Sequence, residues 1–559
     1  YGSAASNGAI MITTKKGRRR PDGAKKTEVE VNSGISFSSI LKYPDFQNTY
    51  GQGDLHGVFD DRRENFSWGL PFDGNLRPWG QVIDGQQKVK PYSALPNNTK
   101  DFFNLGKIYT NSVAVNSGNE DAAFRLGFNT LNSTSIFPGK SYDKYNVTFN
   151  GNANLTNKFY SSISFNYTKS VADLVAGGQG NASLLDNLYQ MPRDIPIRDL
   201  RDLNDKFNSM DYVDENGVHR YGYYGAYAMN PYYTLEKFKN ENRVDRILGN
   251  FIIGYQAFPW LKIENRLGTD MYTDRRYQSA PLFSSEPADE ADPAHRNDVY
   301  TRPQNNVGRY SEDIYNLTNI YNDLMLTFNK EVAKDITLNV LLGHNVTQQR
   351  LNNVYSSTNE DGGLIVPDYY NLQNSNGKVL SLNTLTLIRR VGLYGDAGIS
   401  YKNMLFAGVT ARNDWSSTVP KSYFYYGGNA SFVFTELFNE SLKRYWNYGK
   451  LRISYGAVGN DAPAYSYTTI YNSTVNNADF GSNVFPFRGI PGFSYGNQIG
   501  NPNITPEFSR EFEIGTEQSF LNNRITLDFS YYNKSSKDQI IPVSLPASSG
   551  FTSTIINAG

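Results

Sequence analysis

Apolar and polar residues alternate along several stretches of this chain, at the period of two that is typical of β-strands. In residues 146–155 one face carries Val147 and Phe149, and in residues 524–531 one face carries Ile525, Leu527 and Phe529. The opposite faces carry the polar residues Asn146, Thr148, Asn150, Thr526 and Asp528. One apolar face and one polar face are compatible with either a β-sandwich or a β-barrel.

The lengths of the connections between these strands favour a barrel. Tight turns are predicted at Asn119-Glu120-Asp121, Asn157-Lys158, Pro259-Trp260, Lys402-Asn403 and Asn522-Asn523, with a slightly longer turn over 331–335. Long connections alternate with them at 41–110, 170–243, 274–313, 351–388 and 457–508, and shorter members of the same set lie at 138–139 and 414–421. Short turns on one side and long loops on the other are typical of bacterial transmembrane barrels, whereas such loops are uncommon in compact soluble domains. We therefore predict an all-β protein, a transmembrane antiparallel β-barrel, with about fifteen strands in this chain.

The barrel prediction assigns both faces and both ends of the strands. Val147, Phe149, Ile525, Leu527 and Phe529 should face lipid, and the polar residues opposite them should face the lumen. The tight turns should be periplasmic and the long loops should lie at the cell surface. Residues 435–448 form the one expanded connection on the short side, and we expect a helical stretch there. Because bacterial barrels close with an even number of strands, we also expect further strands beyond residue 559. The chain begins directly with a turn and a short strand, so we expect an earlier segment before residue 1.

Composition narrows the class of protein further. Lys plus Arg and Asp plus Glu both number 54 in 559 residues, so no basic field argues for nucleic acid. The chain contains no run of 18 apolar residues, so no membrane helix is predicted. Aromatic residues make up 14% of the chain, which fits the aromatic girdles of a membrane barrel. The chain has no cysteine, which excludes disulfides, thiolate metal sites and cysteine nucleophiles.

Sequence signatures of catalysis and of tight metal binding are missing. No P-loop, Gly-x-Ser-x-Gly or zincin motif occurs, and His56, His219, His295 and His344 are scattered without ligand spacing. We therefore predict that the protein is not an enzyme and has neither catalytic residues nor a metal site. The acidic segments 211–217 and 286–292 offer oxygen ligands for calcium but lack EF-hand spacing, so a solvated loop is the preferred interpretation of each.

Aromatic residues in the long loops are the candidates for ligand binding. The densest group is Tyr221-Gly-Tyr-Tyr-Gly-Ala-Tyr227, followed by Asn230-Pro-Tyr-Tyr233. Tyrosine combines an apolar face with a hydroxyl, which suits stacking on a sugar or holding a peptide. The alternative is that these rings pack a long loop onto the barrel mouth, and the sequence does not decide between the two. The candidates are Tyr223, Tyr224, Tyr227, Tyr232, Trp68, Trp79 and Trp415.

Four segments extend a family resemblance across nearly the whole chain. The run Tyr1-Gly-Ser-Ala-Ala-Ser-Asn-Gly-Ala-Ile-Met-Ile-Thr-Thr-Lys-Lys-Gly17 resembles the end of the plug domain in SusC-like TonB-dependent outer-membrane transporters of the Bacteroidetes type. Three later segments resemble motifs of the same family in the same order: Asn230-Pro-Tyr-Tyr233, Ala411-Arg-Asn-Asp-Trp-Ser-Ser-Thr-Val-Pro420 and Asn501-Pro-Asn-Ile-Thr-Pro-Glu507.

The resemblance implies a domain layout and a function. Residues 1–17 would end a plug domain, 18–27 would be a linker, and 28–559 would be part of a barrel of about 22 strands. The protein would import a nutrient oligomer, glycan or peptide, across the outer membrane of a Gram-negative bacterium, with a SusD-like surface lipoprotein as lid and the TonB complex as energy source. No cofactor and no nucleic acid are expected. The alternative is a docking barrel in an envelope assembly that imports nothing.

Overall fold

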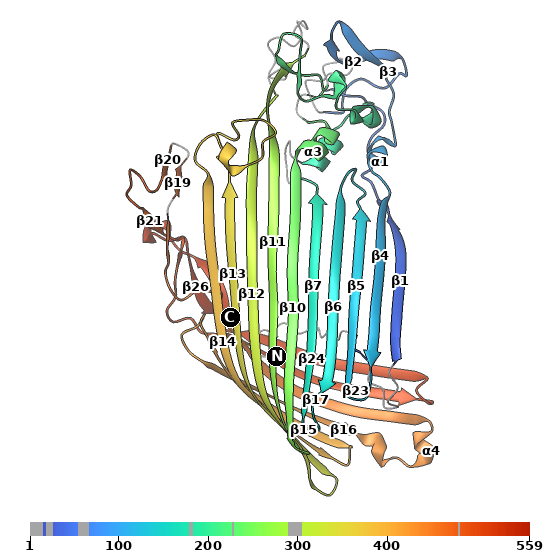
Figure 1. Cartoon of the computed structure of the whole chain (residues 1–559), viewed down its shortest axis with the longest axis vertical. Coiled ribbons are helices and arrows are strands. Elements are labelled where there is room, and N and C mark those ends of the chain that lie inside the picture. The colour runs from blue at the N-terminus through green and yellow to red at the C-terminus, as the bar shows by residue number, and fades with distance from the viewer. Residues whose placement is uncertain are drawn as a thin grey trace.

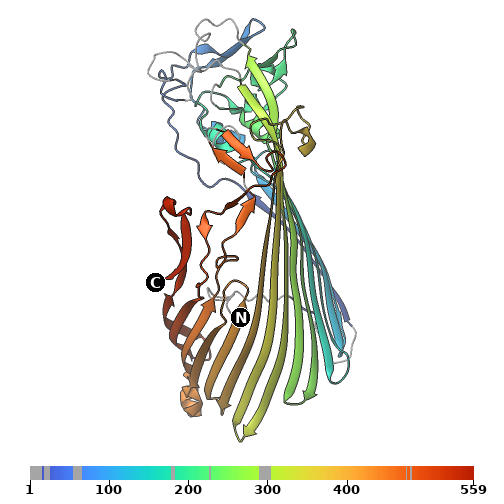
Figure 2. The same ribbon diagram turned by 90° about the vertical axis from the view of Figure 1, so that its left-hand side faces the viewer.

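The computed structural model describes residues 15–17, 26–53, 66–177, 183–225, 228–288, 304–473, 475–478 and 481–559. A single antiparallel meander of long strands dominates it and curves into a trough (Figures 1 and 2). Among the described residues, each long strand pairs with the long strands that precede and follow it, and the first and last long strands, at the edges of the sheet, each pair with one neighbour. The long strands are β1 (Lys26–Ser38), β4 (Gly106–Gly118), β5 (Ala122–Thr134), β6 (Ser141–Asn154), β7 (Phe159–Leu174), β10 (Lys239–Phe258), β11 (Leu261–Pro287), β12 (Gln304–Ala333), β13 (Ile336–Ser357), β14 (Leu380–Tyr401), β15 (Leu405–Ser416), β16 (Tyr423–Val433), β17 (Trp446–Asn460), β23 (Glu507–Phe520) and β24 (Ile525–Lys537). The predicted all-β fold is confirmed.

Register gives the sheet two chemically different faces. Glu264 and Arg266 on β11 point to one face, while Ile263, just before them, and Leu267, just after them, point to the other. The same separation recurs on β17, where Arg452 is flanked by Leu451 and Ile453. We call the face with the charged residues the inner face and the apolar one the outer face.

Short turns gather at one end of the strands and long connections at the other (Figure 1). The five predicted tight turns all lie between paired strands. The turn predicted over 331–335 is shorter than expected, because β12 runs to Ala333 and β13 begins at Ile336. Asp335 closes this turn at φ 64°, a left-handed conformation that Asp tolerates better than most residues. The expanded connection near 435–448 holds η6 (Phe434–Leu437) and α4 (Glu440–Lys443), as predicted.

One predicted long loop is mostly strand. The connection expected over 274–313 shrinks to 288–303, because β11 continues to Pro287 and β12 starts at Gln304. The upper parts of these strands extend beyond the main sheet into the region of the long connections (Figure 2). Polar residues occupy both of their faces there, so the alternation that marks the lower strand fades. The sequence pattern therefore underestimates their length.

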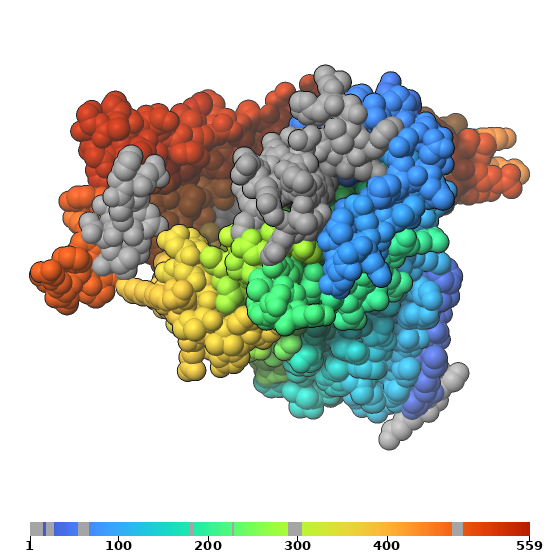
Figure 3. Space-filling model, turned by 90° about the horizontal axis from the view of Figure 1, so that it is seen from above, coloured from blue at the N-terminus to red at the C-terminus, as the bar shows by residue number. Residues whose placement is uncertain are grey.

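The long connections build a second, smaller layer above the sheet, which we call the crown: residues 66–105, 183–225 and 228–238. It contains β2 (Leu76–Ile83), β3 (Gln86–Pro91), α1 (Asn98–Phe102), α2 (Leu184–Tyr189), η2 (Ile197–Arg201), η3 (Lys206–Asn208), β8 (Tyr212–Val213), β9 (His219–Tyr221) and α3 (Pro231–Lys237). Seen from above, the part from 66–105 lies beside the part from 183–225 and 228–238, although residues 106–182 separate them in the chain (Figure 3). They share one hydrophobic core, which makes the crown a folded unit rather than a set of separate loops.

The remaining elements lie in the later connections or follow β24. They are η5 (Leu372–Asn374), β18 (Tyr471–Ser473), β19 (Val475–Ala478), β20 (Gly481–Val484), β21 (Phe493–Tyr495), β22 (Gln498–Ile499), β25 (Gln539–Ser544), η7 (Ala547–Ser549) and β26 (Ser553–Ala558). The β25–β26 hairpin adds β22 as a third strand. No helix in the described part of the chain combines the length and apolar character needed to cross a membrane.

The expected plug end and linker lie almost wholly outside the described residues, which omit 1–14 and 18–25. Lys15 is described, and its Nζ lies 3.8 Å from Glu30 on the inner face of β1. The domain boundaries stay predictions.

Candidate functional site

The inner face of the sheet is lined with paired charges. Arg452 reaches Glu517 at 2.7 Å, Asp528 at 2.9 Å and Glu513 at 3.5 Å, which ties β17 to β23 and β24. On the opposite edge of the sheet, Arg125 on β5 lies 2.9 Å from Glu30 on β1. Because cations and carboxylates alternate, this wall presents polar groups of both signs and no strong net field.

The residues predicted to face lipid and lumen separate onto the two faces. Val147 and Phe149 pair with Phe128 and Leu126 on the outer face. Ile525, Leu527 and Phe529 are also on the outer face and more than half exposed, whereas Asp528 joins the Arg452 cluster on the inner face. Asn146, Thr148, Asn150 and Thr526 share the inner face with it. Contact with lipid itself stays a prediction.

Four of the seven aromatic candidates lie in the crown core. Tyr223 is fully buried, and Tyr224, Tyr232 and Trp79 are nearly so. Their rings contact one another and neighbouring aromatics: Trp79 and Tyr224 are 5.7 Å apart, Tyr223 and Tyr224 4.7 Å, and Phe102 and Tyr232 5.0 Å. Burial raises the pKa of the Tyr223 hydroxyl. This arrangement is the one that the packing alternative predicts, and ligand contact by these four rings stays a prediction.

The other three candidates have different positions. Trp68 is 63% exposed and lies 6.4 Å from the Tyr50 ring, so it is accessible to a ligand. Tyr227 lies outside the described residues. Trp415 was expected in a loop, and this placement is wrong: β15 continues to Ser416, and Trp415 pairs with Val391 within the sheet. The strand period of two puts it on the outer face with Phe424, opposite to Asp414.

Buried polar side chains fasten the crown, and sequence reasoning did not single them out. Gln81 donates to the carbonyl oxygens of Tyr221 and Tyr223 at 3.0 and 2.8 Å, and so joins β2 to the tyrosine-rich segment. Asn98 donates to the carbonyl of Ile195 at 2.6 Å, and Lys90 forms a buried ion pair with Asp194. Their partners are between 97 and 142 residues away in the chain, so no local pattern reveals them.

Asn230, the first residue of one family-like motif, is the central anchor of the crown. It is fully buried, and its Oδ1 accepts the Tyr232 N–H at 3.0 Å, which caps α3. Its amide donates to the carbonyl oxygens of Leu200 and Asn208, both at 2.9 Å. Asn followed by Pro is a helix-start signal, so the sequence contains a local signal for the cap. It contains none for the two hydrogen bonds to the carbonyl oxygens.

Replacing Asn230 with Ala should loosen the crown without unfolding the sheet. The loss of the cap costs about 1 kcal/mol, and two buried carbonyls left without a donor add to it, so we expect a local cost of at least about 2 kcal/mol. Asn230→Ser keeps an oxygen that can accept the capping hydrogen bond but cannot replace both hydrogen bonds that the amide donates. Its loss of stability should therefore lie between zero and that of Asn230→Ala. Hydrogen exchange of α3 amides measures the effect. Unchanged exchange in Asn230→Ala would contradict the anchor role.

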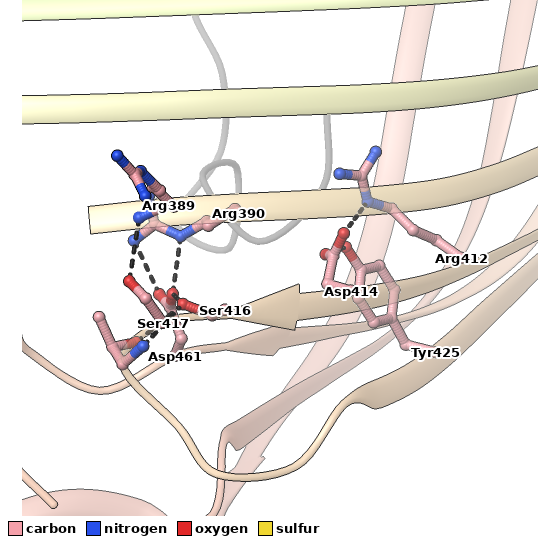
Figure 4. Close-up of polar contacts among 9 residues, drawn as sticks. Arg389, Arg390, Arg412, Asp414, Ser416, Ser417, Tyr425 and Asp461 are labelled. Atoms are coloured by element: carbon pink, nitrogen blue, oxygen red, sulfur yellow. Dashed lines mark hydrogen bonds and ion pairs between the residues drawn. The ribbon is translucent and has the colours of Figure 1, made fainter.

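A second polar network, which we call the seam, joins the upper ends of β14, β15 and β16 to the connection that begins at Asp461 (Figure 4). Asp461 accepts hydrogen bonds from Arg390 at 2.6 and 2.9 Å and from the Ser416 hydroxyl at 2.5 Å. Asp414 accepts from Arg412 at 2.8 Å and from the Tyr425 hydroxyl at 2.6 Å. Arg412, Asp414 and Ser416 all come from the second family-like motif, so this motif fixes a loop onto the inner face.

The third family-like motif holds the same connection from its far end. Ile504 is 1% exposed in a small core with Val419, Tyr423 and Tyr425. Asn501 donates to the carbonyl of Ile555 on β26 at 2.9 Å, and Asn557 on β26 donates to the carbonyl of Thr505 at 2.7 Å. The three motifs inside the described residues therefore all attach long connections to the sheet or to one another.

Asp211 and Asp214, in the first acidic segment, form their contacts with other groups of the protein. Asp211 contacts the His219 ring at 2.8 Å and accepts from the Ser285 hydroxyl at 2.6 Å. The N–H of Val218 and then Arg220 lower the pKa of Asp214. Within the described ranges, no three His, Cys, Asp or Glu side chains are arranged to hold a metal ion. Of the second acidic segment, residues 289–292 lie outside those ranges, so calcium there stays an untested expectation.

Comparisons with known proteins agree with this architecture. Residues 199–559 match the family model described as "TonB dependent receptor-like, beta-barrel". Two TonB-dependent receptors of Formosa agariphila, P26 and P3, are 23% and 22% identical to this chain over all of its length. The fold is similar to that of the RagAB peptide importer in its open-open state, with a TM-score of 0.70, 15% identity and coverage of all of this chain and 59% of that one.

The chain spans about half the length of the curated relatives that it matches, 51% of P26 and 50% of P3. The family model covers most of the present chain, from the crown segment before α3 to its last residue.

Proposed function

The chain belongs to the TonB dependent receptor-like β-barrel family, and from this premise we propose that it forms the wall and surface crown of an importer that carries a nutrient oligomer across the outer membrane. The resemblance drawn from the sequence motifs is confirmed by this membership, and the family consists of receptors rather than enzymes. The family belongs to the outer membrane of Gram-negative bacteria.

One observation carries the proposal: a crown with its own core stands over the end of a trough whose inner face is polar. A solute arriving from the crown side would meet alternating cations and carboxylates along the wall, rather than an apolar surface. Such a surface suits a polar oligomer that makes several weak hydrogen bonds and then leaves.

The proposal includes two partners and a class of substrate. The oligomer would be a peptide or a glycan, and a peptide is supported by the fold of the RagAB peptide importer. A SusD-like surface lipoprotein would close over the crown, and the TonB complex would supply the energy to move a plug. A barrel of about 22 strands would complete the wall.

Uptake measured in cells tests the import function. Cells that express the protein should accumulate fluorescent oligopeptides or oligosaccharides that exceed the size limit of porins. Accumulation should stop when the proton gradient is collapsed, because TonB-coupled transport needs it. Uptake that continues without the gradient, or that is equal in cells lacking the protein, would contradict the proposal.

A docking barrel that imports nothing is the second candidate. The observation that favours it is the burial of Tyr223, Tyr224, Tyr232 and Trp79, since these rings support the crown rather than face a solute. A lid partner that binds the crown at full strength in cells without any uptake would support this alternative.

A further inference from the structure

One row of residues on the outer face combines apolar and polar side chains at a single register. It runs across the six strands β11 to β16 through Asn265, Leu324, His344, Leu393, Asn413 and Phe424. The row crosses a shallow depression of about 470 Å³. Four leucines and Phe424 form its walls, and its floor is low because Gly395 and Ala411 carry little side chain there.

Two polar side chains in this row have no partner within the described part of the chain. His344 and Asn413 flank Leu393, and neither side chain makes a hydrogen bond to another described residue. Asn265 and Asn322, also on the outer face, behave differently because they hydrogen-bond each other at 3.1 and 3.2 Å. A polar group that faces hydrocarbon without a partner is costly, so His344 and Asn413 require hydrogen-bonding groups from outside the chain.

Cations lie above the depression, toward the long connections. Every second residue of a strand points to the outer face. Counted this way, Arg389 is the second outer-face residue above Leu393 on β14, and Arg350 is the third above His344 on β13. Arg389 donates to Gln348 at 2.8 Å, and neither arginine forms an ion pair with a described residue. From the middle of the strands upward, the outer face thus presents an apolar depression, then hydrogen-bonding groups, then two exposed positive charges.

This order follows the chemistry of a phosphorylated lipid from its acyl chains to its head group. We propose that the depression between β12 and β16 binds a phosphorylated acyl lipid of the outer leaflet. An acyl chain would lie over Gly395 and Ala411, the ester or amide groups would hydrogen-bond with His344 and Asn413, and the phosphate would lie near Arg389 and Arg350. The inference rests on the proposed membrane position of the sheet but not on import.

Quenching of Trp415 fluorescence by brominated lipids tests this site, because Trp415 lies one outer-face step above Asn413 on β15. The full-length protein is reconstituted into phosphatidylcholine vesicles that contain either brominated phosphatidylglycerol or brominated phosphatidylcholine. The Trp415 signal is the difference between the native protein and Trp415→Phe. We expect phosphatidylglycerol to quench it several-fold more effectively, and Arg389→Gln to reduce this preference about fivefold, as expected for one basic residue at a membrane surface.

Two double variants distinguish lipid binding at this site from general contact of the outer face with lipid. His344→Leu combined with Asn413→Leu should weaken quenching by phosphatidylglycerol, whereas the matched pair Asn265→Leu with Asn322→Leu should not. Displacement by unlabelled lipid A or by unlabelled phosphatidylglycerol distinguishes a glycolipid from a phospholipid. Displacement by neither, or equal quenching by both brominated lipids in the native protein, overturns the proposal.

The tryptophan at the short-turn end distinguishes failure of the site from failure of the membrane placement. Trp260 stacks on Phe258 at 5.0 Å beside the β10–β11 turn. If brominated lipids quench Trp260 but not Trp415, another protein surface covers the depression and the lipid site is wrong. If neither tryptophan is quenched, the sheet is not in lipid, and the proposed function falls with the site.

Discussion

Replacing Phe529 with Arg is expected to destabilise the folded barrel by about 2–4 kcal/mol, the cost of a cation on the lipid face near the membrane midplane. Phe529 is 61% exposed on the outer face of β24, five residues from the short turn and paired with Thr516. In water such an exposed side chain would tolerate arginine at little cost. The large expected effect therefore comes from lipid alone.

The matched control is Thr526→Arg on the inner face of the same strand, beside the Arg452 cluster. It should cost much less, because an inner arginine meets water and the carboxylates of Glu517 and Asp528. Both variants are refolded into liposomes and titrated with denaturant to obtain the free energy of unfolding. Equal losses in the two variants would contradict the assignment of the two faces.

Replacing Asp461 with Ala is expected to release the long connection at the seam, at a cost of about 2–4 kcal/mol. Removing one partner of a buried ion pair typically costs about 3–5 kcal/mol because the other charge is left uncompensated. The expected value is lower here because Arg390 is 26% exposed and keeps some contact with water, while Asp461 is only 4% exposed. Hydrogen exchange of amides in 461–473 measures the opening.

An exposed ion pair of the crown provides the control for the seam. Arg198 lies 2.9 Å from Asp101 and is 73% exposed. Arg198→Ala should therefore change stability by less than about 1 kcal/mol. If Asp461→Ala has an effect as small as this control, the seam does not hold the connection.

The seam should also respond to acid in a defined direction. Burial alone would raise the pKa of the Asp461 carboxyl, but the hydrogen bonds and charge of Arg390 outweigh it, so the pKa is lowered. A lowered pKa means that the stabilisation is fully present above the ordinary Asp range, about pH 4, and is lost as pH falls through the lowered value. Amides in 461–473 should thus stay protected at mildly acidic pH, and Asp461→Asn should remove the pH dependence.

The strands and turns were predictable because an apolar outer face and a polar inner face impose a strict period of two. Where the upper ends of β11 and β12 have polar residues on both faces, the pattern weakens, and the sequence suggested a loop. Trp415 was misplaced for a related reason, since its Ser and Thr neighbours resemble loop residues although β15 continues to Ser416.

The crown was predictable only in part. The Asn230-Pro231 helix start is a local signal in the sequence, and the structure shows Asn230 capping α3. The burial of Tyr223 and Trp79 could not be recognised, because the crown core joins connections that are far apart in the chain, as in the contact of Trp79 with Tyr224. Such contacts leave no local trace in the sequence. His344 belongs to no motif in the sequence, and only strand register places it on the outer face.

Labelling of single cysteines on intact cells tests the central claim, a sheet that spans the outer membrane with its crown side outside. These 559 residues contain no cysteine, so each introduced thiol is unique among them. Val366 is 52% exposed in the connection between β13 and β14, and Asn522 lies in the short turn between β23 and β24. A large, impermeant maleimide should label Val366→Cys on intact cells and Asn522→Cys only after the outer membrane is opened. Labelling of Asn522→Cys on intact cells, with Val366→Cys protected or equally labelled, would contradict the account.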